Sequence, residues 1–138
     1  MTIFTRTLLA IAVVSGSLML AVSAAYADPV AECQKVTASQ VETGQCLEET
    51  LTTVDAVVDS AFGSAQAAAD ELDAVTGRPA ARQALERSQN AWFEFRNINC
   101  LVPAAMAAGA SGSGDFTVGC QIEMARARTE ELQAMAHR

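Results

Sequence analysis

One apolar stripe constrains the fold of this chain more than any other feature. Between residues 39 and 75 the apolar side chains recur every three or four positions, the spacing that places them on one face of an α-helix. They are Leu47, Leu51, Val54, Val58, Ala61, Ala65, Ala68, Leu72 and Val75. A helix with such a face must pack it against other elements. The pattern therefore predicts a long helix covered by further helices.

The ends of this helix are marked by capping residues. Ser39 followed by Glu42 resembles a capping box, in which the hydroxyl and the carboxylate accept hydrogen bonds from free backbone N–H groups. Gly77 fits the other end, since glycine accepts the left-handed conformation there. Gly44 and Gly63 each cost about 1 kcal/mol relative to alanine, so the helix could fray or kink near them.

Two further helices are expected. The second helix is expected to start at Pro79, because a proline's missing N–H does no harm in the first turn of a helix. Its helical pattern weakens at Pro103. Its inner side is expected to carry Leu85, Gln89, Trp92, Phe95 or Arg96, Asn99 and Val102. The third is capped by Asp115 or Thr117, with an inner face of Cys120, Met124, Ala127, Leu132 and Met135. Short connections make consecutive helices antiparallel. The predicted fold is all-α, a small antiparallel three-helix bundle with a long first helix.

The N-terminus has the features of a cleavable secretory signal over residues 1–27. Arg6 supplies the positive region, residues 8–22 are apolar, and Ala25-Tyr26-Ala27 is a small-x-small cleavage sequence. The alternative, a membrane anchor, is disfavoured because a spanning helix needs about 20 apolar residues. We expect a periplasmic or secreted mature domain over residues 28–138, with no membrane insertion after cleavage.

The mature chain is acidic. It keeps all 16 Asp and Glu residues but loses Arg6 from the nine Lys and Arg residues. Nucleic acids and anionic membrane surfaces are poor partners for such a chain, because both attract excess positive charge. A basic protein is the partner that this charge favours.

The four cysteines, Cys33, Cys46, Cys100 and Cys120, all fall in the mature chain. In an oxidising compartment we expect two disulfides that staple the small bundle. Cys33 with Cys46 and Cys100 with Cys120 close the shortest loops, although pairing of Cys46 with Cys100 is also geometrically reasonable. A zinc site is disfavoured, since no close cysteine pair occurs and the lone His137 adds nothing. No metal or cofactor is expected.

We expect no enzymatic activity. With a single histidine, no Ser-His-Asp or Cys-His set can assemble. The carboxylate pairs Glu48-Glu49 and Glu130-Glu131 could suggest a glycosidase, but adjacent helical residues point about 100° apart. Solvated helix faces explain these pairs better.

Several residues form a set with a defined order and spacing: Cys33, Cys46, Asp55, Gln89, Trp92, Arg96, Cys100, Gly112-Ser113-Gly114, Cys120, Arg128 and Leu132. This set resembles the LprI-type lysozyme inhibitor N-terminal domain family. Asn97 and Phe62 depart from the family, which usually has aspartate and tyrosine there. The resemblance implies a small exported helical domain and inhibition of lysozyme by a non-catalytic binding protein that blocks the cleft of a basic muramidase. The alternative is a periplasmic envelope stress protein, either a holdase or a scaffold component.

Two sets of residues are candidates for function. Residues 104–119, held between two cysteines, offer Ser111, Ser113, Asp115 and Phe116 to a partner, or simply link two helices. Trp92 and Arg96 are expected inside the bundle, with Arg96 bridging to Asp55 and Arg128 joining the same network. Otherwise they form an exposed anchor pair, since both residue types are common at interface hot spots.

Overall fold

The computed structural model describes residues 27–137, which contain helices and no strand. The helices are α1 (Pro29–Gln34), α2 (Gln40–Thr76), α3 (Ala81–Asn99), α4 (Leu101–Met106) and α5 (Ser113–Ala136). The all-α prediction is confirmed, but two short helices join the three that were expected. Within the described residues, no helix is both long and apolar enough to cross a membrane. The predicted signal of residues 1–27 lies outside the described residues apart from Ala27.

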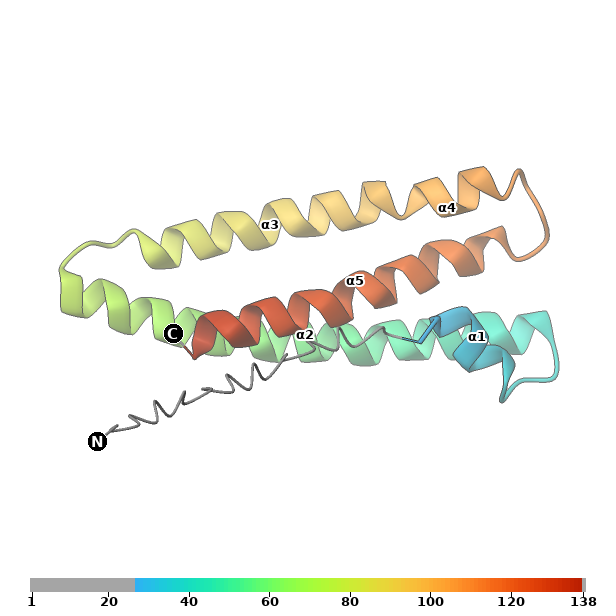
Figure 1. Cartoon of the computed structure of the whole chain (residues 1–138), viewed down its shortest axis with the longest axis horizontal. Coiled ribbons are helices and arrows are strands. Elements are labelled where there is room, and N and C mark those ends of the chain that lie inside the picture. The colour runs from blue at the N-terminus through green and yellow to red at the C-terminus, as the bar shows by residue number, and fades with distance from the viewer. Residues whose placement is uncertain (1–26, 138) are drawn as a thin grey trace, which may run out of the picture.

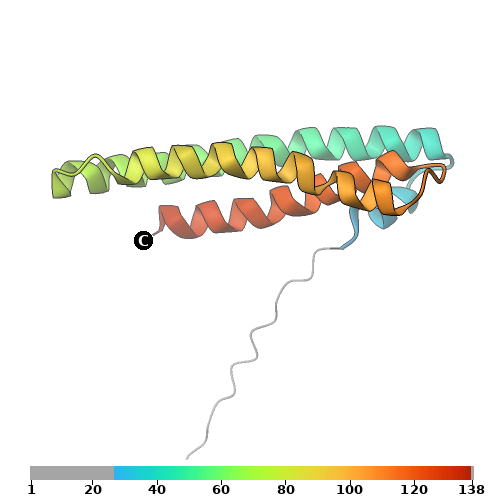
Figure 2. The ribbon, with the colours of Figure 1, turned by 90° about the horizontal axis from the view of Figure 1, so that it is seen from above.

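The three long helices lie lengthwise beside one another. Figure 1 shows α3 running back along α2, and α5 running in the same direction as α2. The same arrangement is seen from above in Figure 2. The most extensive packing is between α2 and α5. The two short helices lie at the end of the molecule where α2 and α5 begin.

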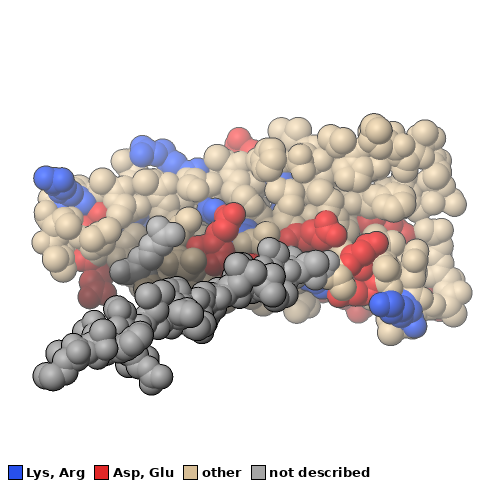
Figure 3. Space-filling model, in the orientation of Figure 1, with Lys and Arg blue, Asp and Glu red and all other residues tan. Residues whose placement is uncertain are grey.

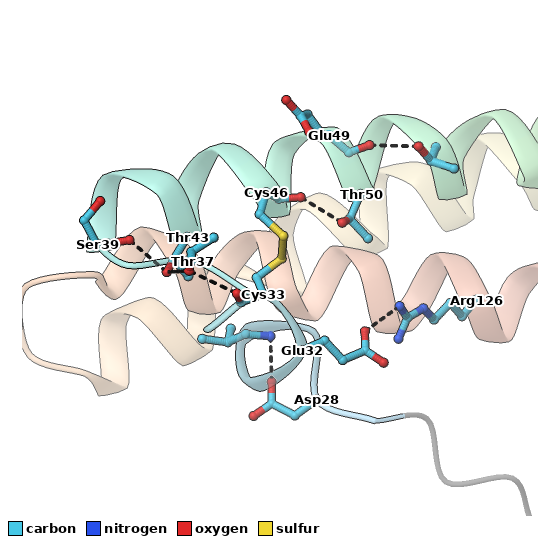
Figure 4. Close-up of a disulfide and its surroundings, with 12 residues drawn as sticks. Asp28, Glu32, Cys33, Thr37, Ser39, Thr43, Cys46, Glu49, Thr50 and Arg126 are labelled. Carbon is cyan, nitrogen blue, oxygen red and sulfur yellow. Dashed lines mark hydrogen bonds and ion pairs between the residues drawn. A yellow bond between two sulfur atoms is a disulfide. The ribbon is translucent and has the colours of Figure 1, made fainter. Parts of the chain in front are cut away.

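Helix α1 is fastened to two of the long helices. The Cys33–Cys46 disulfide joins it to α2, and the Glu32 carboxylate accepts a 2.8 Å hydrogen bond from Arg126 of α5 (Figure 4). Gly119 lies under α1, where a Cβ atom would come within 3.0 Å of the Val30 side chain. These contacts explain how a helix of six residues holds its place.

The predicted ends of the long α2 helix are confirmed. The backbone N–H of Glu42 donates to the Ser39 hydroxyl, and the Glu42 carboxylate accepts from the N–H of Ala38. Gly77 closes the helix with φ of +65°. The helix passes through Gly44 and Gly63 without a break.

Helix α3 starts and ends differently from the prediction. It begins at Ala81, and Asp73 of α2 caps it by accepting backbone N–H groups of Ala81 and Arg82 at 2.9 and 3.1 Å. Helix α3 ends at Asn99 because Pro103, with no N–H, cannot continue the hydrogen-bond ladder. Pro103 instead occupies the first turn of α4.

The core follows the predicted α2 stripe for most of its length. Leu47, Val58, Ala61 and Ala65 are buried, mainly against α5. Leu72 and Val75 are exposed, because α5 ends before α2 does (Figures 1 and 2). Leu72 and Ala68 of the stripe line an apolar groove of about 330 Å³ together with Ala81, Leu85 and Met135.

The predicted inner faces of the other two long helices need correction. In α5 the buried residues are Gly119, Ile122, Ala125, Arg128 and Leu132. Ala127 and Met135 are exposed. The apolar pattern did not predict this buried face correctly, because a charged residue, Arg128, occupies one turn of it. In α3, Arg96 points inward, whereas Phe95 and Asn99 are exposed. Val102, expected on the same helix, lies in α4 and is also exposed.

Candidate functional site

Both disulfides lie at the same end of the molecule. Cys33 pairs with Cys46, and Cys100 pairs with Cys120, which is the pairing favoured by the loop lengths. The first disulfide holds α1 on α2, and the second holds the end of α3 on the first turns of α5. We call this end, where α2 and α5 start and α4 lies, the disulfide end.

The segment between Cys100 and Cys120 has more structure than expected. It contains α4 and the first two turns of α5, so only residues 107–112 form a loop. Ala108, Gly109 and Gly112 have positive φ values of 52°, 76° and 82°. The left-handed conformation costs a residue with a Cβ, such as Ala108, about 1–2 kcal/mol. The loop is therefore a defined turn that the surrounding contacts maintain.

Gln40 and Asp115 clamp this turn onto the start of α2. The Gln40 side-chain amide donates to an Asp115 carboxylate oxygen at 2.9 Å. Gly112 lies directly beneath Gln40, and a Cβ atom there would fall 2.0 Å from the amide nitrogen. The positive φ value favours glycine at position 112, and a larger side chain there would displace the Gln40 amide from its bond to Asp115. No local pattern predicts this role for Gln40, because its partner is 75 residues away.

A groove of about 730 Å³ opens beside this clamp, between the first turns of α2 and α5. Its walls are Gly44, Gln45, Glu48, Glu49, Gly114, Asp115 and Val118. Three carboxylates thus line one concave surface, with small residues between them. Figure 4 shows Glu49 pointing away from the Cys33–Cys46 disulfide. Such a surface suits a lysine or arginine side chain of a partner.

The structure brings together only part of the predicted contact set. Asp115 lines the groove, whereas Ser111, Ser113 and Phe116 do not. Ser111 is on the exposed turn, Ser113 begins α5, and Phe116 is 45% exposed. Glu48 and Glu49, interpreted as a solvated face, line the groove. Nothing in their local pattern distinguishes a groove wall from a solvated helix face.

Arg96 and Asp55 form an ion pair between α3 and α2. The guanidinium donates to both carboxylate oxygens, at 2.5 and 3.3 Å. The Arg96 side chain is 7% exposed and that of Asp55 is 34% exposed. The guanidinium carbon also lies 4.9 Å from the centre of the Trp92 ring, within cation–π range. The bridge expected from the sequence is present.

Arg128 enters the same network from α5. Its Nε donates to the Gln89 side-chain oxygen at 3.0 Å, and its guanidinium carbon is 5.8 Å from the Trp92 ring. Trp92 itself is partly buried, packed against the main core cluster that contains Leu132. Arg96 Nε and Gln89 Nε2 have no protein acceptor within the described chain. Trp92, Arg96 and Arg128 thus join the three long helices rather than forming an exposed anchor.

Between residues 27 and 137, all cysteines are in disulfides and no group of three or more His, Cys, Asp or Glu could hold a metal ion. His137 is exposed.

Comparisons with known proteins show which sequences this chain is similar to. The chain is 28% identical over 112 residues to the uncharacterized protein R02472 of Rhizobium meliloti (strain 1021), covering 78% of this chain and 80% of that protein. No solved structure gives a significant match. The family described as "Lysozyme inhibitor LprI" matches residues 32–132, which include all four cysteines, the Trp92 network and the groove. The chain therefore belongs to the LprI family of lysozyme inhibitors.

Proposed function

We propose that this protein is an exported, non-catalytic inhibitor that binds a basic lysozyme and blocks its cleft. In this proposal residues 1–27 are removed on export, and residues 28–138 act in the periplasm or after secretion. Membership of the LprI family supports inhibition at the family level. The observation that carries the proposal for this chain is the carboxylate-lined groove at the disulfide end.

Charge gives the groove its selectivity. Glu48, Glu49 and Asp115 lie together on a protein with 16 acidic and nine basic residues. An acidic surface steers a basic enzyme toward it and raises the association rate. Because the groove is concave and bounded by a pinned turn, little conformational entropy is lost on docking. In this proposal the groove both attracts the basic enzyme over a distance and contacts it after docking.

The test is a titration of the oxidised protein against a basic lysozyme, following cell-wall lysis at low and physiological salt. We expect inhibition that saturates near one-to-one and persists at physiological salt. Glu48→Gln combined with Glu49→Gln should weaken inhibition several-fold, because it removes charge from the groove. Asp59→Asn with Glu71→Gln is the control, since it removes the same charge at exposed α2 positions outside the groove.

Equal weakening by both double variants would mean that net charge alone matters and that the groove has no special role. Absence of inhibition by the wild-type protein would refute the proposal. The alternative role, an envelope holdase or scaffold component without lysozyme-related activity, would then be preferred. Binding of a hydrophobic dye on acidification would distinguish it, because a holdase must expose an apolar face.

A further inference from the structure

An apolar surface covers the end of α3 and the whole of α4. Phe95, Ile98, Leu101, Val102 and Met106 are each between 56% and 80% exposed. Single exposed apolar residues are ordinary, but a contiguous set marks an interaction surface. These five residues fall within one short stretch of chain, and we call their surface the α3–α4 face.

The α3–α4 face carries no charge. From Asn97 to Gly114 the sequence has no Asp, Glu, Lys or Arg, although charged residues make up 18% of the chain. Figure 3 shows the result as an uncharged surface over α4 and the end of α3. Charged residues are depleted in the central, fully buried part of protein interfaces. The α3–α4 face has the composition of such a centre.

The backbone under this face is fixed at several points. Cys100 is bonded to Cys120 of α5, and Pro103 sets the backbone of the first α4 turn. The Gln40–Asp115 hydrogen bond anchors the turn that follows α4. A partner that docks here therefore meets a surface that is already ordered.

The charge at this end of the molecule favours a basic partner for the face. The groove with Glu48, Glu49 and Asp115 lies at the same end of the molecule, where α2 and α5 begin (Figure 1). An apolar centre with an acidic rim suits a basic protein. A second copy of this acidic chain would bring like charges together at the rim, which is unfavourable.

We infer that the α3–α4 face is the surface on which the target lysozyme docks, with the groove as its acidic rim. This inference rests on the proposed function and adds the docking surface to it. Apolar burial on the face supplies most of the affinity, and the groove supplies attraction and orientation.

The test is Ile98→Glu in the oxidised protein, with binding to a basic c-type lysozyme measured by calorimetry at physiological salt. Ile98 is 70% exposed, so the substitution should leave the melting temperature unchanged. By charge alone, an added carboxylate would strengthen binding to a basic enzyme. We expect instead that Kd rises at least tenfold, because a carboxylate would be buried in an apolar contact.

Val75→Glu is the matched control, since Val75 is 81% exposed and lies at the other end of the molecule. Its Kd should match that of the wild type. If Ile98→Glu also matches the wild type, the docking face is wrong and the proposed function stands. If the wild-type protein does not bind lysozyme, both are wrong. A wild-type dimer that Ile98→Glu dissociates, with lysozyme binding unchanged, would assign the face to a second copy and overturn the inference.

Discussion

At the scale of single residues, the buried charge of Arg96 is the feature that depends most on one partner. A guanidinium that is 7% exposed must have a counterion, and Asp55 is the carboxylate that pairs with it. Asp55→Asn removes the charge and keeps the shape. We expect the free energy of unfolding to fall by about 1–3 kcal/mol, reduced from the buried-pair range because Asp55 is partly solvated.

Asp59→Asn is the control for this prediction, because Asp59 is exposed on the same helix. It should change the stability by no more than about 0.5 kcal/mol. Denaturant unfolding of both variants provides the comparison. A stability loss no larger for Asp55→Asn than for Asp59→Asn would show that Arg96 does not depend on this partner.

Single contacts could be predicted from the sequence where the pattern is local or where a buried charge needs a counterion. The Ser39 cap, the Gly77 stop and the bridge from Arg96 to Asp55 belong to this group. Prediction failed where a side chain of one helix binds the start of another. Gln40 bonds to Asp115, 75 residues away, and Asp73 caps α3 from the last turn of α2, eight residues before Ala81. Neither contact has a recognisable local signature.

At the scale of helices, the start of α3 depends on Asp73 of α2. The backbone N–H of Ala81 is the main cause of the lowered pKa of Asp73, followed by that of Arg82. A carboxyl group whose pKa is lower in the native than in the unfolded state stabilises the fold above the unfolded pKa of about 3.9. This contribution is lost as the pH falls through the lowered native pKa.

Asp73→Asn should therefore lower the melting temperature at pH 7, and its difference from the wild type should shrink as the pH falls below about 3.9. Thermal unfolding by circular dichroism from pH 7 to pH 2.5 measures both effects. Glu71→Gln, at an exposed position of α2, serves as the control. A difference that stays constant over this range would contradict the account of the α3 cap.

The Cys100–Cys120 disulfide should matter for both stability and binding. It closes a loop of sequence separation 20, for which the chain-entropy estimate is about 3 kcal/mol. Replacing both cysteines by alanine should lower the free energy of unfolding by about that amount and weaken lysozyme binding, because the α3–α4 face loses its anchor.

The matched control replaces Cys33 and Cys46, which fasten α1 instead. This variant should lose comparable stability while binding more tightly than the Cys100/Cys120 variant. Far-ultraviolet circular dichroism would establish that both variants are folded at the temperature of the binding measurement. Equal binding by the two variants would mean that the anchor under α4 has no part in recognition.

At the scale of the whole molecule, the two ends differ in structure. One end carries both disulfides, the clamped turn, the groove and the α3–α4 face. At the other end α2 extends past α5, which exposes Leu72 and Val75 and leaves the apolar groove. The sequence predicted the long stripe but could not predict where its cover would stop, because that depends on the offset between α2 and α5.

Binding of lysozyme at the disulfide end can be located by hydrogen–deuterium exchange of the oxidised protein, with and without a saturating basic lysozyme. We expect slower exchange on binding in residues 95–118 and 40–49, with the turn around Gly77 unchanged. Protection around Gly77 and the far end of α2, or no protection anywhere, would show that lysozyme does not bind at the disulfide end.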